Sequence, residues 1–239
     1  MTEWARKVFW SKVAVTPRPG GFGVMLDGRL VRTPAKAPLI LPTRGLADRV
    51  AAEWAAQRGK VLPTTMPATQ MANLAVDKLP QHGREVVALL AEYGATDLIC
   101  YRAPGPAALI ARQAAAWDPL LDWAADALGV RLKPGTGVMP IAQDPAGLKA
   151  LAARVAALPP FQLAPFHDLV SISGSLVLAL AVTADRLSSE SAWTVSRIDE
   201  DWQAELWGAD DEAQLASDLK RAAFLRAARF FQLADQAFA

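Results

Sequence analysis

Alternating apolar and polar positions near the start of the chain predict short antiparallel strands. Apolar segments at 13–15, 22–26 and 29–32 are separated by a Pro- and Gly-rich segment at 17–21 and by Asp27-Gly28. An Asp-Gly pair supplies the positive φ angles that a two-residue hairpin loop requires. A further strand is expected at 39–41. This part of the chain therefore predicts a small antiparallel β-meander.

After residue 43 the period of the apolar positions lengthens from two to about 3.6 residues, which is typical of helices. Leu46, Val50 and Trp54 share one face of a predicted helix, and Thr43 is placed to cap its start. Further helices are expected over 67–75, 84–93, 106–128, 145–158, 161–182, 189–207 and 211–238. Between them we expect an extended segment at 96–101 and a hairpin that pairs 130–132 with 138–139.

These elements predict an α+β fold with a change of character near residues 45–60. We expect a small antiparallel β-rich N-terminal domain over residues 1–50 and a larger, mostly α-helical domain over residues 51–239.

Composition and charge exclude several classes of protein. Of the 239 residues, 52% are hydrophobic and 21% are charged, which is typical of a folded globular chain. The 25 Lys and Arg residues balance 24 Asp and Glu residues, so the chain has no overall positive charge to attract nucleic acid. One cysteine and two histidines argue against disulfides and against a metal centre. We expect no cofactor, no metal and no nucleic-acid partner.

The sequence also predicts a cytoplasmic protein without membrane insertion. Residues 1–10 lack the apolar stretch of a secretory signal. The longest apolar run, 169–182, contains Ser171, Ser173, Gly174 and Ser175 and is shorter than the roughly 20 residues that a membrane span needs. We interpret this run as part of a buried helix.

Candidate catalytic residues have simpler structural interpretations. His167, Asp168 and Ser171 are residue types of an acyl-transfer site, but no nucleophile-elbow pattern surrounds the serine, which can satisfy helix backbone instead. Cys100 is interpreted as a buried small side chain. The glycines at 20–23 are flanked by strands and suit a turn better than a phosphate-binding loop. The sequence therefore predicts a protein that is not an enzyme.

The segment 196–208 stands out because carboxylates border an apolar helical stripe. Val195, Ile198, Trp202 and Leu206 recur at helical spacing, with Asp201 and Glu205 along one border and Asp199 along the other. Asp201 and Glu205 also repel each other weakly at i, i+4. Two interpretations remain open: a core stripe with a solvated acidic edge, or a surface that binds a partner.

Several ordered strings resemble the ATP12 family of assembly chaperones for the F1 part of ATP synthase. Leu30, Ala55 and Trp202 depart from the residues usual in that family. The resemblance covers most of the chain and rests on Phe9-Trp10, the segment 24–34, Leu41-Pro42-Thr43, the segment 52–57, Met66-Pro67, the segment 72–75 and the segment 196–208, which ends in Trp207-Gly208.

The resemblance implies a non-enzymatic chaperone that binds the free F1 α subunit until the β subunit replaces it. It also implies that the acidic cluster is needed for this function. We therefore expect the partner-binding residues to be Asp199, Glu200, Asp201, Trp202, Glu205 and Trp207. We also expect a protein that is monomeric when free and that lies in the bacterial cytoplasm, or in the mitochondrial matrix for organellar relatives.

Two alternatives come from other classes of protein. The first is a small-molecule enzyme with a site between the two domains, where Asp199 or Glu200 acts as a base and Arg29 or Arg32 holds an anion. The second is a structural subunit that stays in the final assembly.

Overall fold

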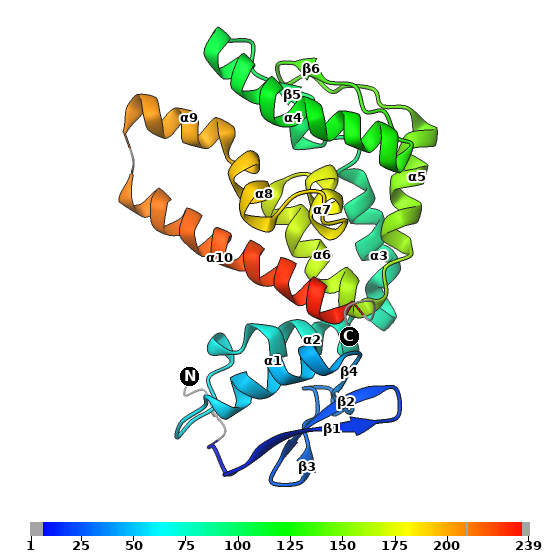
Figure 1. Cartoon of the computed structure of the whole chain (residues 1–239), viewed down its shortest axis with the longest axis vertical. Coiled ribbons are helices and arrows are strands. Elements are labelled where there is room, and N and C mark those ends of the chain that lie inside the picture. Colours follow the sequence, from blue (N-terminus) through cyan, green and yellow to red (C-terminus); the bar gives the residue numbers. More distant parts are fainter. Residues whose placement is uncertain (1–6, 209, 236–239) are drawn as a thin grey trace. The chain divides into compact units, whose positions relative to one another are not determined.

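The computed structural model describes residues 7–208 and 210–235, which form two compact units (Figure 1). Of these residues, the first unit holds 7–83, 159–165 and 229–235, and the second unit holds the rest. Both units combine segments that are far apart in the sequence. The structure has a small antiparallel sheet and many more helical residues, so the predicted α+β class is confirmed.

The sequence predicts a domain boundary after residue 50, and this stays a prediction. Contacts within the chain place the residues on both sides of that position in the same unit. Helix α1 (Arg44–Ala55) lies across that position and packs against strands β1 (Val13–Arg18) and β2 (Gly21–Leu26). One face of a small sheet must be covered to exclude water, and α1 provides that cover.

The sheet of the first unit is the predicted meander. Strand β2 pairs antiparallel with β1 along one edge and with the short strands β3 (Arg29–Leu30) and β4 (Ile40–Leu41) along the other. Asp27 and Gly28 have φ angles of 44° and 82°, which confirms the two-residue loop. The Asp27 carboxylate also accepts the backbone N–H of Lys12 at 2.8 Å and that of Ser11, and these bonds lower its pKa.

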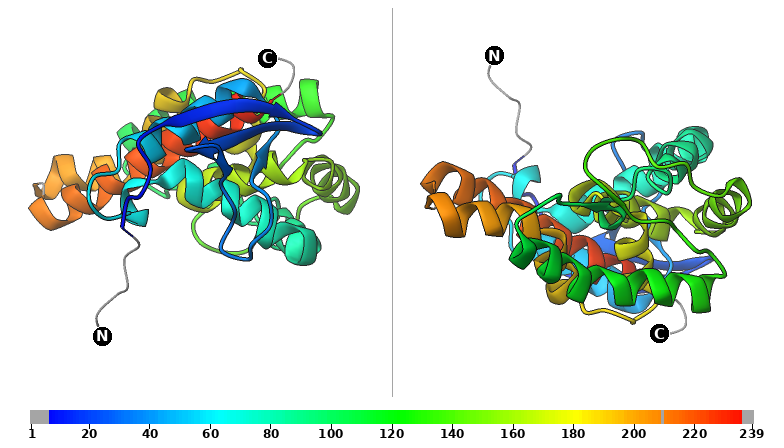
Figure 2. Two further views of the ribbon diagram at one scale, coloured as in Figure 1. Left: turned by 90° about the horizontal axis from the view of Figure 1, so that it is seen from below. Right: turned by 90° about the horizontal axis from the view of Figure 1, so that it is seen from above.

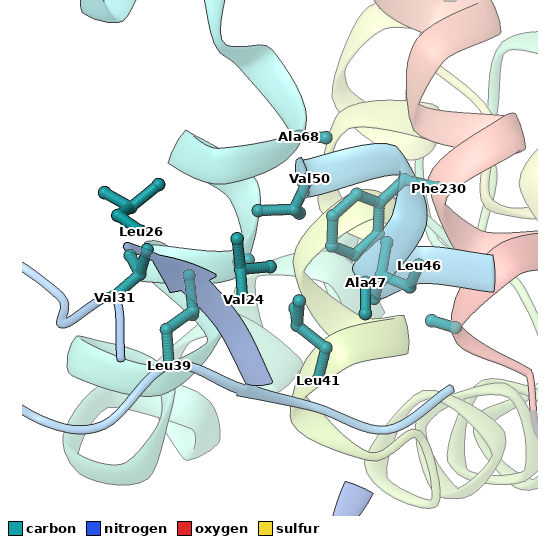
Figure 3. Packing of buried hydrophobic residues seen from close by; sticks show 12 residues of the cluster. Val24, Leu26, Val31, Leu39, Leu41, Leu46, Ala47, Val50, Ala68 and Phe230 are labelled. Carbon is teal, nitrogen blue, oxygen red and sulfur yellow. The ribbon is translucent and has the colours of Figure 1, made fainter. Parts of the chain in front are cut away.

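The core of the first unit lies between this sheet and α1 (Figure 3). Phe230, near the end of helix α10 (Asp211–Ala234), lies among Leu46, Ala47 and Val50 of α1. Thr43 accepts the N–H of Leu46 at 3.1 Å, which confirms the predicted cap. The Thr43 hydroxyl donates in turn to the carbonyl of Leu233, which is 190 residues away along the chain. Residues at both ends of the sequence therefore build one core.

Glu53 is the buried residue of the last turn of α1, and its neighbour Trp54 is only half-buried. The Glu53 carboxylate accepts the N–H of Ala68 at 2.9 Å, and the N–H and the hydroxyl of Thr69 at 2.8 and 2.9 Å. These groups lie in the first turn of helix α2 (Pro67–Asp77), where Met66 offers no side-chain cap. Because the first N–H groups of a helix have no partner within that helix and these ones are buried, Glu53 is a cap supplied by another helix.

The second unit is mostly helical. Helix α4 (Ala107–Leu128) is followed by Gly129, whose φ of 70° confirms the predicted stop. Helix α7 (Leu176–Thr183) is buried along Leu176–Val182 and packs against α4 and α8 (Ser189–Ser196). Helices α3 (Leu79–Glu92), α6 (Pro160–Ser173) and α10 have residues in both units. The remaining elements in chain order are η1 (Pro63–Thr65) in the first unit, then η2 (Leu98–Cys100), β5 (Tyr101–Arg102), β6 (Gly135–Thr136), α5 (Pro145–Ala156) and α9 (Ile198–Trp207).

Two of the predicted long helices are divided. Gly174, with φ of 72°, ends α6, and Ser175 accepts the N–H of Leu178 at 3.0 Å to start α7. The predicted helix over 189–207 breaks at Arg197 between α8 and α9. The helix predicted over 211–238 is α10, and the last predicted residues, 236–238, lie outside the described residues, as do residues 1–6 of the segment tested for a signal.

The strands predicted between residues 96 and 139 were wrong except at Tyr101, which begins strand β5. Asp97 accepts the N–H of Ile99, which turns Leu98–Cys100 into a 3₁₀ helix in place of an extended segment. Strand β5 pairs in parallel with β6, so no hairpin joins 130–132 to 138–139. A parallel pair needs a long connection, here through α4, and apolar alternation alone does not reveal it.

None of the helices in the described part of the chain is both long enough and apolar enough to cross a membrane.

Asp97 is a fully buried carboxylate that connects η2 with α7. It accepts the N–H of Val177 at 3.0 Å in addition to that of Ile99. Burial raises its pKa from an ordinary value of 3.8 to about 6, although its hydrogen bonds with Ser175 and with backbone N–H groups oppose the shift. The folded protein therefore holds the Asp97 proton more tightly than the unfolded chain does.

We expect this difference to make the folded protein less stable as the pH rises. Below about pH 3 both states are protonated, whereas between about pH 4 and pH 6 the unfolded chain has largely lost the proton that the folded protein still holds. Relative to Asp97→Asn, the wild-type free energy of unfolding should fall by about 2 kcal/mol between pH 4 and pH 7. Urea titrations of both proteins across this range measure the difference. A difference that is flat with pH, or that rises, would contradict the raised pKa.

Candidate functional site

Helix α9 carries all six residues that the sequence predicts as a partner-binding site. Its first residue, Ile198, is buried, and Arg197 just before it pairs with Glu200 at 2.7 Å. The Arg197 guanidinium also lies 5.5 Å from the ring of Trp193 in α8. The start of α9 is therefore fixed to the rest of the second unit.

Helix α4 holds the middle of α9. Arg112 forms a bidentate pair with Glu205, at 2.7 and 2.9 Å, and its guanidinium lies 5.0 Å from the centre of the Trp202 ring. Gln113, which is fully buried, donates to the Asp199 carboxylate at 2.6 Å. Paired planar groups of this kind fix an orientation as well as a distance. Asp199, Trp202 and Glu205 are therefore in contact with α4.

These contacts affect the acidic side chains unequally. The hydrogen bond from Arg112 lowers the pKa of Glu205, which keeps it ionised. Partial desolvation raises the pKa of Asp201; the Arg197 charge opposes this shift and the Glu205 charge adds to it. Of the predicted carboxylates, Asp199 and Glu205 are tied to α4 and Glu200 is tied to Arg197.

The end of α9 leaves the packed part of the unit. Trp207 is 82% exposed and Leu206 is 57% exposed, although Leu206 belongs to the same apolar stripe as the buried Ile198. On the first half of α10, Leu215 and Leu219 are 62% and 64% exposed and lie one turn apart on one face. In Figures 1 and 2, α9 and the start of α10 lie at one extremity of the second unit.

We call residues 198–208 and 210–219 the α9–α10 arm. Its charge is of one sign, because residues 198–219 contain eight carboxylates and no Lys or Arg. It therefore combines exposed large apolar side chains with a negative surround. Exposed apolar side chains gathered in one place mark interaction sites more often than isolated ones do. Of the two open interpretations, this geometry favours a partner-binding surface at the exposed end of the stripe.

Sequence reasoning missed four residues of this site. Arg112 and Gln113 lie on α4, far from α9 in the sequence, and no local pattern indicates that they meet it. Leu215 and Leu219 did leave a signal, since they are the only large apolar residues within the polar segment 210–220.

The residues considered as catalytic candidates in the sequence form contacts that belong to the fold. The His167 ring contacts Asp168 at 3.2 Å, while the hydroxyls of Ser171 and Ser173 donate to backbone carbonyls one turn earlier, as the simpler interpretation predicts. Cys100 is buried, and its burial raises the pKa of the thiol to about 12. Within residues 7–208 and 210–235 no group of three or more His, Cys, Asp and Glu side chains could hold a metal ion.

Comparisons with known proteins give a consistent answer. The family model described as ATP12 chaperone protein matches residues 7–125. The crystal structure of Atp12 from Paracoccus denitrificans is 46% identical, with a TM-score of 0.94 over 98% of this chain and 100% of that one. A protein from Agrobacterium tumefaciens is 40% identical, with a TM-score of 0.89 over 96% of this chain and 86% of that one. Mitochondrial Atp12 from Schizosaccharomyces pombe is 26% identical in an alignment of 223 positions that covers 86% of this chain and 75% of that protein.

Proposed function

This chain belongs to the ATP12 family of chaperones for ATP synthase assembly, and from that premise we propose that it binds the free F1 α subunit through its α9–α10 arm. The observation that carries the proposal is the exposure of Leu206, Trp207, Leu215 and Leu219 on an acidic arm whose α9 part is paired with α4. The α subunit is the client that the family resemblance in the sequence implies.

The physical task of such a chaperone is to cover a surface made for another subunit. Obligate interfaces between subunits are large and apolar, so an unassembled subunit is prone to aggregate. Apolar side chains at the end of the arm would supply affinity. The surrounding carboxylates would speed association and orient the client, because charges at the rim of an interface act mainly on the association rate.

Release by displacement fits this task better than release by a nucleotide cycle. The sequence holds no phosphate-binding loop of a known pattern. In the proposed cycle the β subunit competes for the same surface of the α subunit and the chaperone leaves, so no catalytic residue is needed. The proposed compartment is that of the unassembled F1 subunits, the cytoplasm in a bacterium and the matrix in a mitochondrion.

The test is the aggregation of isolated α subunit on dilution from denaturant. An equimolar amount of this protein, without any nucleotide, should suppress the rise in light scattering. Addition of the β subunit should then release the chaperone from the α subunit. Binding to β alone, or an absolute need for hydrolysable ATP, would contradict the proposed function.

The role of the acidic cluster is tested separately by replacing Asp199 and Asp201 with Asn and Glu200 with Gln. The amide at 199 can still accept from Gln113, and relief of the Asp201–Glu205 repulsion favours folding. Loss of the Arg197–Glu200 pair should cost less than about 1 kcal/mol because Glu200 is exposed, so stability should nearly hold. Association with the α subunit should become slower and lose part of its dependence on salt. An unchanged rate and an unchanged salt slope would place the client contact elsewhere.

A further inference from the structure

The first unit contains a pocket of about 640 Å³ that the proposed function does not use. It is lined by the segment around Phe9, by β3 and the loop that follows it, by residues 61–66 and by one face of α2. All of its lining residues belong to the first unit. A volume of this order is typical of sites that enclose a whole small molecule.

The interior of the pocket is apolar and rich in aromatic rings. Leu26, Val31 and Met66 are buried lining residues. Phe9 contacts Trp10 at 5.2 Å between ring centres, and Trp10 contacts Trp54 at 5.3 Å, both in edge-to-face geometry. Phe9 itself remains 64% exposed. An apolar ligand could therefore contact a row of three rings, from the exposed Phe9 to the partly buried Trp10 and Trp54.

The charged lining residues of the pocket are all positive. Lys7, Arg29, Arg32 and Lys36 line it and are exposed, while no Asp or Glu is among the lining residues. None of the four forms a salt bridge with a carboxylate in the described part of the chain, although Arg32 donates to the carbonyl of Lys36 at 2.8 Å. Arg29 does interact electrostatically with Asp27, which lies outside the lining. Cations without a close carboxylate partner beside an apolar cavity favour a ligand that carries a negative group.

Two lining residues also hold polar atoms that lack partners. The indole nitrogen of Trp54 and the side-chain oxygen of Asn73 are buried, and neither has a hydrogen-bond partner among the described residues. Buried polar atoms are nearly always paired in folded proteins, so an unpaired donor and an unpaired acceptor in one lining are an unusual combination.

We propose that this pocket binds an anionic amphiphile, a small molecule with a carboxylate or phosphate head and an apolar body. The head group would lie near Arg29, Arg32 and the two lysines, and the apolar body would lie against the aromatic row. The pocket and the α9–α10 arm have opposite charges, so a client segment that suits the acidic arm does not suit this site. The inference stands apart from the proposed function, since it concerns other residues and another class of ligand.

Calorimetry with decanoate, decyl phosphate and 1-decanol tests the proposal on the whole chain. Both anions should bind, and their relative affinities identify the preferred head group. The Arg29→Gln/Arg32→Gln variant should weaken anion binding by at least about 10-fold, because charge-assisted contacts are lost, and should leave 1-decanol binding unchanged. The matched control is Arg131→Gln/Lys149→Gln, which removes two exposed cations of the second unit and should change nothing.

The indole N–H resonance of Trp54 gives a local readout, and it should shift on addition of decanoate to the wild-type protein. Failure of both anions to bind, or equal affinity of wild type and the Arg29/Arg32 variant, would overturn the proposal. A variant that binds amphiphiles normally but loses the α subunit would assign the pocket to client contact and would also overturn it. Because Arg29 and Arg32 are exposed, their replacement is not expected to impair folding.

Discussion

Replacing Trp207 with serine is expected to weaken binding of the F1 α subunit by about 30-fold or more while leaving thermal unfolding unchanged. Tryptophan side chains at the centre of interfaces are frequent sources of affinity, because they cover a large area with few rotatable bonds. Trp207 is 82% exposed and stands at the end of α9, so in the free protein it contributes little to the fold. Binding and unfolding should therefore respond separately.

The matched control for Trp207 is another exposed apolar side chain that lies outside the α9–α10 arm. Met139, in the loop after β6, is 75% exposed, and Met139→Ser should leave both α-subunit binding and unfolding unchanged. Equal losses of binding in the two variants would indicate non-specific hydrophobic attraction. Full binding by Trp207→Ser would remove the arm from the proposed interface.

Replacing Glu53 with alanine should destabilise the folded protein by about 3–5 kcal/mol, because the buried donors of Ala68 and Thr69 lose their acceptor. Glu53 is almost fully buried, and Arg49 approaches it at 3.7 Å, so its carboxylate also compensates a nearby cation. Among the described residues, no other side chain is seen to cap the start of α2, where Met66 itself offers none. Urea titration measures the loss directly.

Asp48 provides the comparison for Glu53 on the same helix. It forms an exposed pair with Arg44 at 3.1 Å, and Asp48→Ala should cost less than about 1 kcal/mol because such pairs are solvated. If the two substitutions cost the same, the interaction of Glu53 with α2 contributes no more than a surface ion pair.

Features of the fold that depend on neighbouring residues in the sequence could be predicted. The Asp27-Gly28 loop, the Thr43 cap and the stop at Gly129 each require a particular backbone conformation or a donor within a few residues, and the residue types indicate them. The break between α6 and α7 at Gly174 also depends on a local backbone conformation. It was not predicted, because the residues around it form one continuous apolar run.

Features that depend on distant residues could not be predicted in the same way. No neighbouring residue in the sequence indicates that Glu53 is buried and not solvated, because the first N–H group that it accepts lies 15 residues later. The bond between Arg112 and Glu205 joins residues 93 positions apart. For the same reason, helical spacing places Ile198 and Leu206 on one stripe but gives no sign that only the first is covered.

The contribution of α10 to the core of the first unit bears on how the protein is synthesised. Phe230 and the Leu233 carbonyl complete a core whose other parts, the sheet and α1, leave the ribosome first. At about 5–20 residues per second, the 190 residues between Thr43 and Leu233 take roughly 10–40 s to translate. During that interval Leu46 and Val50 lack the aromatic side chain that covers them. This chaperone therefore passes through a state with exposed apolar surface, the same hazard from which it is proposed to protect its client.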